Sequence, residues 1–114
     1  MADRGDVMIL KRRLGFGAPG RADRVVVVQA RDINAVAPTT IVVPLDEERS
    51  VYAGQPRFVA VSAAEAGTDR RHTALVTLLT SVSIDRLEPG AVGRLSALTL
   101  AKIDRALRIV LDLA

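Results

Sequence analysis

The chain of 114 residues contains no cysteine, no tryptophan and one histidine, and only 3% of its residues are aromatic. Without cysteine it has no disulfide, thiolate zinc site, iron–sulfur cluster or cysteine nucleophile. A single histidine also argues against a histidine-rich metal site, so we expect neither metal nor cofactor. Because 49% of the residues are hydrophobic, the core is predicted to be aliphatic, with few platforms for base stacking.

The chain is also short, and it lacks long apolar runs. Its length predicts a single domain over residues 1–114, with any site in a surface groove or between subunits. No run approaches the roughly 18–20 apolar residues that a membrane helix needs, and the first residues lack a signal-peptide core. We therefore expect a soluble, cytoplasmic protein without membrane contact.

Charge is distributed unevenly along the chain. Residues 1–31 carry seven Lys or Arg against three acids, a local charge of +4, whereas residues 32–56 carry one Arg against four acids, a local charge of −3. A basic N-terminal third suits a partner that bears phosphates or acidic side chains. The alternative at this point is an ordinary solvated surface.

Hydrophobic patterning predicts a sheet followed by a helix. The apolar runs and alternations favour about five short strands. Apolar positions Leu100, Ile103, Leu107 and Leu111 share one helical face, which predicts a helix over about residues 96–113. Such an order is typical of a mainly-β fold, a small barrel or curled sheet with a helix packed on it. The expected strands cover residues 7–10, 25–28, 39–45, 57–62 and 73–79.

Two connections and one proline qualify this pattern. Residues 11–24, with three Gly, one Pro and five basic side chains, form a connection of the length that is usually functional or mobile. A second long connection is marked by residues 46–49 (Asp-Glu-Glu-Arg) and then by residues 54–56 (Gly-Gln-Pro). Pro44 is expected at a strand end or a bulge, because proline cannot donate to a sheet ladder.

Three sequence features match familiar chemistry but favour simpler interpretations. The glycines at 15, 17 and 20 fit a dinucleotide-binding pattern, yet the next element is predicted to be a strand and not the helix that such a site needs. His72 is a possible general base beside Arg70 and Arg71, but an exposed loop histidine is the favoured interpretation. Consecutive acids at 46–48 alternate in direction on an extended chain, which disfavours a metal site.

Arg24 is more informative, because it ends the basic connection and directly precedes four valines. Its backbone is then held by a strand while its guanidinium reaches solvent, where it can grip a phosphate with two hydrogen bonds. The alternative is a surface arginine without a ligand.

Five short motifs, taken in order, resemble the MazF/PemK family of bacterial toxin ribonucleases, the toxin half of type II toxin–antitoxin pairs. The correspondence spans nearly the whole chain. The motifs are residues 4–7 (Arg-Gly-Asp-Val), 24–28 (Arg and four Val), 32–34 (Asp-Ile-Asn), 41–45 (Ile-Val-Val-Pro-Leu) and 103–107 (Ile-Asp-Arg-Ala-Leu).

The resemblance implies an SH3-like small barrel with an appended helix, assembled as a homodimer. It also implies metal-independent cleavage of single-stranded RNA, in which the ribose 2′-hydroxyl attacks the adjacent phosphate and leaves a 2′,3′-cyclic phosphate and a 5′-hydroxyl end. A cognate antitoxin with an acidic C-terminal segment would neutralise this activity. Arg24 takes the position of the family's catalytic arginine, and Lys11, Arg12, Arg13 and Arg21 are candidates to hold flanking phosphates.

The chain departs from the family at two site elements. Asp46 stands where the family carries a threonine, which makes it a candidate base for the 2′-hydroxyl or an altered site residue. Leu78, Thr80 and Ser81 stand about where Gln, Arg and Thr are expected, so Thr80 and Ser81 are the candidate RNA contacts there. Two hypotheses follow: an endoribonuclease toxin, or a MazF-like module that has lost cleavage and binds an antitoxin-type peptide or nucleic acid.

Overall fold

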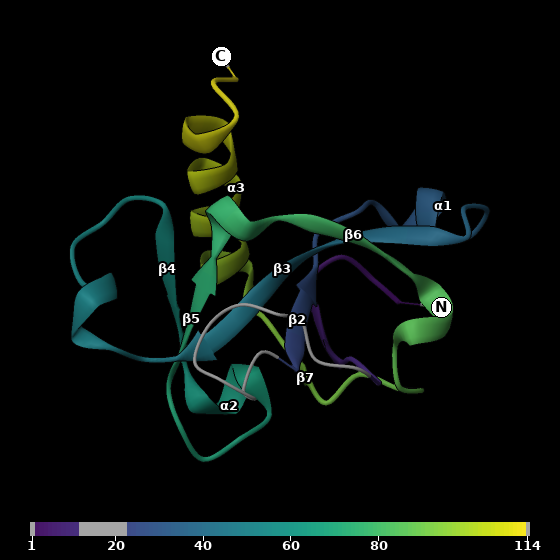
Figure 1. The fold of residues 1–114 in the computed structure, drawn as a ribbon, viewed down its shortest axis with the longest axis horizontal. Coiled ribbons are helices and arrows are strands. Elements are labelled where there is room, and N and C mark those ends of the chain that lie inside the picture. Colours follow the sequence, from purple (N-terminus) through teal and green to yellow (C-terminus); the bar gives the residue numbers. More distant parts are fainter. Residues whose placement is uncertain (1, 12–22, 114) are drawn as a thin grey trace.

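The computed structural model describes residues 2–11 and 23–113, and within them seven strands pair into one antiparallel sheet (Figure 1). The strands are β1 (Asp6–Ile9), β2 (Arg24–Val27), β3 (Thr39–Glu47), β4 (Phe58–Val61), β5 (His72–Leu75), β6 (Thr80–Ser83) and β7 (Gly93–Arg94). The helices are α1 (Arg31–Asn34), α2 (Ala63–Ala66) and α3 (Ala97–Val110), and short 3-10 turns are η1 (Ser50–Tyr52), η2 (Val76–Leu78) and η3 (Ile84–Arg86).

The nine-residue strand β3 organises the sheet, whose order is β4-β5-β3-β2-β1-β7. One edge of β3 pairs with β2, whereas the other edge pairs first with β6 and then with β5. Pro44 lies between these two pairings, opposite Val25 of β2. Alternation along the strand directs its nitrogen toward the gap between β6 and β5, where no ladder hydrogen bond is lost. Of the two expected positions, a strand end or a bulge, the strand end is wrong: the proline lies inside β3, at the point where the strand changes partner.

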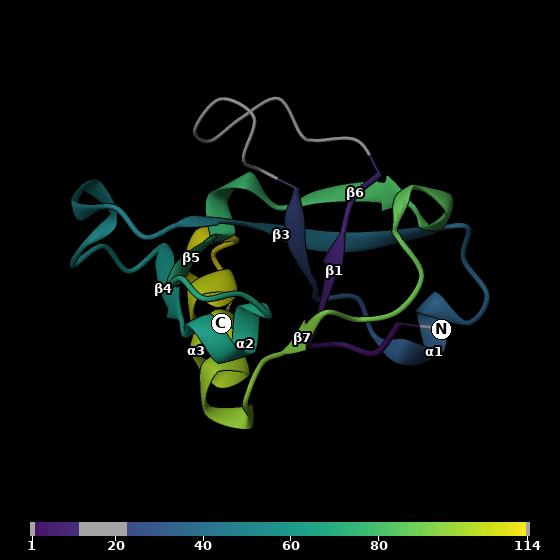
Figure 2. The same ribbon diagram turned by 90° about the horizontal axis from the view of Figure 1, so that it is seen from below.

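Alternate residues of the strands supply two aliphatic clusters, one on each face of the curled sheet. The larger contains Val26, Val43 and Leu45 and is covered by α3, through Ile103 and Ala106. Figure 2 shows α2 and α3 together on one side of β3. The other face carries a smaller cluster around Met8, Leu10, Val25, Val27, Val42, Val82 and Leu87.

Helix α3 confirms the predicted C-terminal helix. It begins after Ser96, whose hydroxyl accepts a hydrogen bond from the Thr99 backbone N–H at 3.2 Å. Its buried residues include Ile103, which the apolar spacing had placed on the core face. The mainly-β class with a C-terminal helix is thus confirmed. In the part of the chain that the structure describes, no helix is long and apolar enough to cross a membrane.

The predicted strand over residues 73–79 is wrong in its extent. Strand β5 ends at Leu75, turn η2 follows, and β6 begins at Thr80. The break carries the chain from one half of β3 to the other. Every residue from His72 to Val76 is buried, so hydrophobicity alone did not reveal where the strand stops.

The first residues fasten β1 to the C-terminal helix. The Arg4 side chain donates from Nε to the Val28 carbonyl at 2.8 Å and pairs with Asp104 of α3. The Gly5 N–H donates to the Val27 carbonyl at 2.8 Å, with a φ of 96° that favours glycine. Asp6 pairs with Arg94 of β7. The Arg-Gly-Asp sequence therefore has a structural role, because its contacts connect the start of the chain to β2, β7 and α3.

Helix α2 is only four residues long, and Glu65 holds it in place. One Glu65 carboxylate oxygen accepts from the Ser62 N–H at 3.1 Å, while the Ser62 hydroxyl accepts from the Glu65 N–H at 3.2 Å, which is a capping box. The other Glu65 oxygen accepts from the Ser96 N–H at 2.8 Å. Burial acts to raise the pKa of Glu65, but hydrogen bonds from Ser96, Thr99 and Ser62 outweigh it and lower the pKa to about 2. One carboxylate thus joins the N-termini of α2 and α3.

Two glycines let α2 approach β7 closely. Gly67 ends α2 in the left-handed region, and a Cβ there would lie 2.0 Å from the Val92 carbonyl oxygen. A Cβ on Gly93 would lie 2.1 Å from the Glu65 carbonyl oxygen. Backbone meets backbone at both points, so neither position accommodates a side chain.

We expect Gly67→Ala to destabilise the fold well beyond the cost of its φ angle. Gly90 is the matched control, because it has a similarly positive φ of 82° but nothing within 4 Å of its Cβ position. Gly90→Ala should cost about 1 kcal/mol, the penalty for an L-residue in the left-handed region. Gly67→Ala should cost a further 1–3 kcal/mol, roughly, from overpacking. Urea unfolding measures both, and equal losses would contradict the close approach.

Glu65→Gln should produce a pH-dependent loss of stability. Because folding lowers the pKa of Glu65 from 4.5 to about 2, its charge stabilises the fold above pH 4.5, and the benefit disappears as the pH falls toward 2. At pH 7 the variant should therefore be less stable by about 1 kcal/mol, the usual cost of losing a partly exposed helix cap. At pH 2 the variant and the wild type should have nearly equal free energies of unfolding. Urea unfolding from pH 7 to pH 2 checks this. A difference that does not change with pH would show that the charge is irrelevant.

Candidate functional site

Arg24 is the first residue of β2, between Ile9 of β1 and Leu45 of β3. Its side chain is half-buried, and one guanidinium nitrogen donates to the Ala66 carbonyl of α2 at 3.1 Å. This bond uses one of the five N–H groups and fixes the plane of the guanidinium. The strand therefore places the arginine, and α2 orients it.

Asp46 lies near the C-terminal end of β3 and is 1% exposed. One of its carboxylate oxygens accepts from the Glu47 N–H at 3.0 Å. The other accepts from the Tyr52 hydroxyl at 2.7 Å and lies 3.3 Å from Nε of Arg49. Turn η1 thus folds back so that a phenol and a guanidinium enclose the carboxylate.

The structure does not bring Arg24 and Asp46 together on one face of the sheet. Arg24 pairs with Leu45, so its side chain shares the face of Leu45 and the larger cluster. Asp46 is the next residue of β3 and therefore points to the opposite face. Both residues lie at the same end of β3, but they are separated by the thickness of the sheet.

The other predicted contacts are dispersed. Lys11 is exposed just after β1, and its N–H donates to the Arg86 carbonyl at 2.8 Å. Thr80 and Ser81 pair with Val42 and Ile41, along the N-terminal half of β3 and away from Asp46. Arg12, Arg13 and Arg21 lie outside the described residues.

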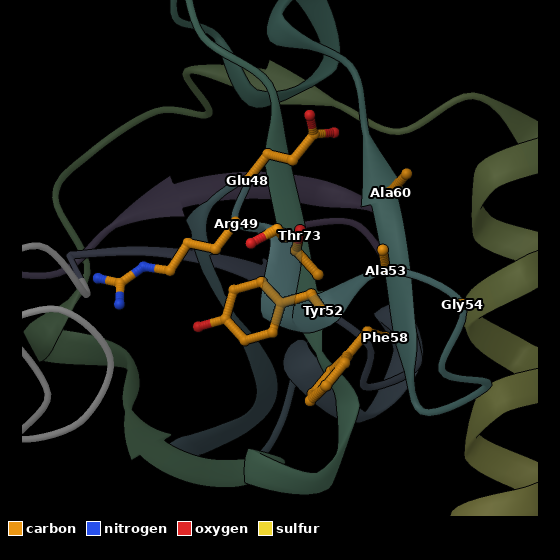
Figure 3. Close-up of a pocket in the computed structure, with 9 residues that line it drawn as sticks. Glu48, Arg49, Tyr52, Ala53, Gly54, Phe58, Ala60 and Thr73 are labelled. Carbon is orange, nitrogen blue, oxygen red and sulfur yellow. The ribbon is translucent and has the colours of Figure 1, made fainter.

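A pocket of about 460 Å³ opens beside Asp46, on the same face of the sheet (Figure 3). Tyr52 and Phe58 line one end of it, with ring centroids 4.8 Å apart and planes at 65°, an edge-to-face contact. Thr73 and Ala60 lie between this pair and Glu48 in the close-up. The other lining residues are Arg49, Ser50, Ala53 and Gly54.

Tyr52 acts as a hydrogen-bond donor in this arrangement. Burial, the hydrogen bond to Asp46 and the charge of Asp46 raise the pKa of Tyr52 to about 12, against a smaller opposing effect of Arg49. The phenol therefore stays protonated around neutral pH. Its hydroxyl holds Asp46 while its ring forms part of the pocket wall.

His72 and the acidic run take structural positions. The interpretation of His72 as an exposed loop residue is wrong, since it is 7% exposed at the start of β5, with its Nδ1 2.9 Å from the Arg70 carbonyl. Glu47 pairs with Arg70. Within residues 2–11 and 23–113, no three His, Cys, Asp or Glu side chains are grouped to hold a metal ion.

The aromatic pocket and the residues that shape it were not predicted from the sequence. Tyr52 and Phe58 are two of only three aromatic residues in the chain; Tyr52 lies in the connection between β3 and β4, and Phe58 begins β4. The scarcity of aromatic residues was the available signal. Because the core is aliphatic, two aromatic residues beside one polar connection indicate a role outside the core. The Ser62-x-x-Glu65 capping pattern was a second signal that was not used.

Solved structures share this fold over almost the full chain. A mycobacterial endoribonuclease in complex with its cognate antitoxin has a TM-score of 0.78 at 22% identity, covering 100% of this chain and 98% of that one. The Mycobacterium tuberculosis toxin MazF-mt6 has a TM-score of 0.75 at 16% identity, covering 96% and 98%. A chain of a MazE–MazF structure from Deinococcus radiodurans has a TM-score of 0.74 at 20% identity, covering 99% and 98%.

At these identities the structural likeness concerns the fold. No curated protein sequence shows significant similarity to the chain. Residues 3–111, however, match the family described as PemK-like, MazF-like toxin of type II toxin–antitoxin system, in agreement with the ordered motifs. The chain therefore belongs to this family of PemK-like and MazF-like toxins.

Proposed function

We propose that the protein is an endoribonuclease toxin that cleaves single-stranded RNA without a metal ion. The observation that carries this function is Arg24, a half-buried arginine at the position of the family's catalytic arginine, oriented by the Ala66 carbonyl. In the reaction, the 2′-oxygen bonds to phosphorus and the bond to the 5′-oxygen breaks. The 2′-hydroxyl proton is lost, and the leaving oxygen gains one. Negative charge accumulates on the phosphoryl oxygens, and a fixed guanidinium stabilises that charge.

Asp46 has a supporting role in this proposal. A general base must come within hydrogen-bond reach of the 2′-hydroxyl. Both oxygens of Asp46 already accept hydrogen bonds, and its side chain is inaccessible. We infer that Asp46 positions Arg49 and Tyr52, and that Lys11 contributes a flanking phosphate contact.

The enclosed Asp46 also favours a second candidate function, a MazF-like module that binds RNA or an antitoxin-type peptide without cleavage. In that case Arg24 would contribute to binding alone. Cleavage itself distinguishes the two functions.

Arg24→Ala should reduce RNA cleavage by at least about 100-fold, the usual scale for removing one stabiliser of transition-state charge. Arg24→Lys should remain impaired, because an ammonium lacks the planar fork of donors. The assay uses a long single-stranded RNA in EDTA, with analysis for 2′,3′-cyclic phosphate and 5′-hydroxyl ends. Arg108→Ala is the control, since Arg108 is exposed in the last turn of α3.

Equal cleavage by wild type and Arg24→Ala would refute the role of Arg24. Folded wild-type protein that binds the RNA and leaves it intact would instead establish the binding module.

We infer that the cognate antitoxin docks in a groove between β4 and α3. This groove, about 390 Å³ in volume, combines apolar side chains with Lys102 and Arg105 of α3. Strand β4 is the edge of the sheet, which an extended peptide can join. Such a surface suits a segment with alternating acidic and apolar residues. One solved structure with this fold is an endoribonuclease in complex with its cognate antitoxin, which supports a partner of this kind.

We also propose a homodimer, supported by apolar side chains that protrude near the end of α3. Ile109, Leu111 and Leu113 are each about half exposed, at 52%, 48% and 59%. Wild type should sediment at about twice 12.2 kDa at micromolar concentration, and Leu111→Asp should shift it to monomer. Leu98→Asp is the control, at the other end of α3. A monomeric wild type would contradict the dimer, and a dimeric Leu111→Asp would contradict this surface.

A further inference from the structure

We propose that the pocket beside Asp46 binds one unpaired nucleobase of the RNA and sets a base preference beside the cleavage position. This inference rests on the proposed action on RNA. Its volume of about 460 Å³ lies in the range of small-molecule sites. Its walls combine two aromatic rings with a few polar groups, the composition that recognises a flat heteroaromatic ligand.

The aromatic pair is the first argument. The chain has three aromatic residues, and two of them, Tyr52 and Phe58, meet here in an edge-to-face contact. Neither belongs to the aliphatic clusters that form the core. Base–aromatic stacking contributes about 1–3 kcal/mol per base, so one accessible ring is a substantial binding element.

The rings are also fixed in position. The Tyr52 hydroxyl donates to buried Asp46 at 2.7 Å, so the phenol cannot rotate away without leaving that carboxylate short of a donor. The Arg57 guanidinium lies 4.9 Å from the centre of the Phe58 ring on β4. A preformed stacking surface binds more tightly than a flexible one, because less entropy is lost when the base binds.

Polar groups at the other end of the pocket give the site its preference. Glu48 is exposed, and its backbone is held by a hydrogen bond from its N–H to the Arg71 carbonyl at 3.0 Å. Figure 3 places Glu48 across Thr73 from the aromatic rings. A carboxylate only accepts hydrogen bonds, so it selects a base that presents an exocyclic amino group, such as cytosine or adenine, over uracil.

The surrounding charges suit the phosphates of the same strand. Arg49 projects away from the pocket in the close-up, and Arg57 borders Phe58. Arg24 lies at the same end of β3 but on the opposite face. An RNA strand that reaches both must pass around this end of the sheet, so we place the base in the pocket on a neighbouring nucleotide and not at the scissile position itself.

The test measures binding separately from cleavage. Labelled 2′-O-methyl oligonucleotides of cytosine, adenine or uracil lack the attacking hydroxyl, so fluorescence anisotropy reports affinity alone. Wild type should bind the cytosine and adenine oligomers roughly tenfold more tightly than the uracil oligomer. Phe58→Leu, which removes a ring but keeps apolar volume, should weaken binding of all three by about tenfold. Glu48→Gln should bind all three with similar affinity.

Val51→Ala is the matched control, because Val51 lies in the same turn, is 64% exposed and does not line the pocket. Circular dichroism and urea unfolding check that Phe58→Leu is folded. Glu48 is exposed, so we expect Glu48→Gln to leave the fold unchanged. Unchanged affinities in both variants, or no binding by wild type, would overturn the pocket. Cleavage of unmodified RNA by the same proteins tests the nuclease separately. If Arg24→Ala loses cleavage while the two pocket variants bind RNA as wild type does, the pocket is refuted and the nuclease is not.

Discussion

The change of partner along β3 is the constraint on which the structure depends. Strand β3 pairs with β2 along one edge, whereas its other edge must leave β6 before it reaches β5. Pro44 occupies that gap, where its missing N–H costs no ladder hydrogen bond. The sheet carries a separate aliphatic cluster on each of its two faces. It also brings the start of β2, the end of β3 and the connection to β4 to one end of the molecule.

The sequence predicted the parts of the fold whose apolar residues recur with a clear strand or helix period, or whose ends are marked by clear turn residues. The strand of valines after Arg24 and the apolar face of α3 are confirmed. In both segments the pattern of apolar residues within the segment itself is enough to indicate which residues are buried. The break between β5 and β6 was missed, since the turn η2 between them is largely apolar and continues the pattern of β5, and only pairing with β3 separates the two strands. Pro44 was expected at a strand end or a bulge, because one sequence does not show which partner pairs with each edge of the strand.

For the candidate site, the sequence predicted where a residue lies only when its position follows from its own strand. Arg24 begins β2 as expected, but its partner, the Ala66 carbonyl, depends on how α2 packs against β7. That packing requires two glycines, Gly67 and Gly93, far from Arg24 in sequence. Asp46 was expected to face substrate, and its enclosure by Tyr52 and Arg49 became visible only once turn η1 was placed. Side-chain direction depends on register, which local composition does not give.

Asp46 links the departure from the family to the aromatic pocket. The resemblance places a threonine hydroxyl here, and a buried carboxylate in its place must be neutralised or supplied with donors. Arg49 brings the opposite charge, and Tyr52 brings a protonated hydroxyl, whose pKa burial and Asp46 raise to about 12. To reach the carboxylate, Tyr52 must lie over the sheet, where its ring meets Phe58. A carboxylate at this position therefore needs donors, and Tyr52, which supplies one of them, also forms part of the aromatic wall of the pocket.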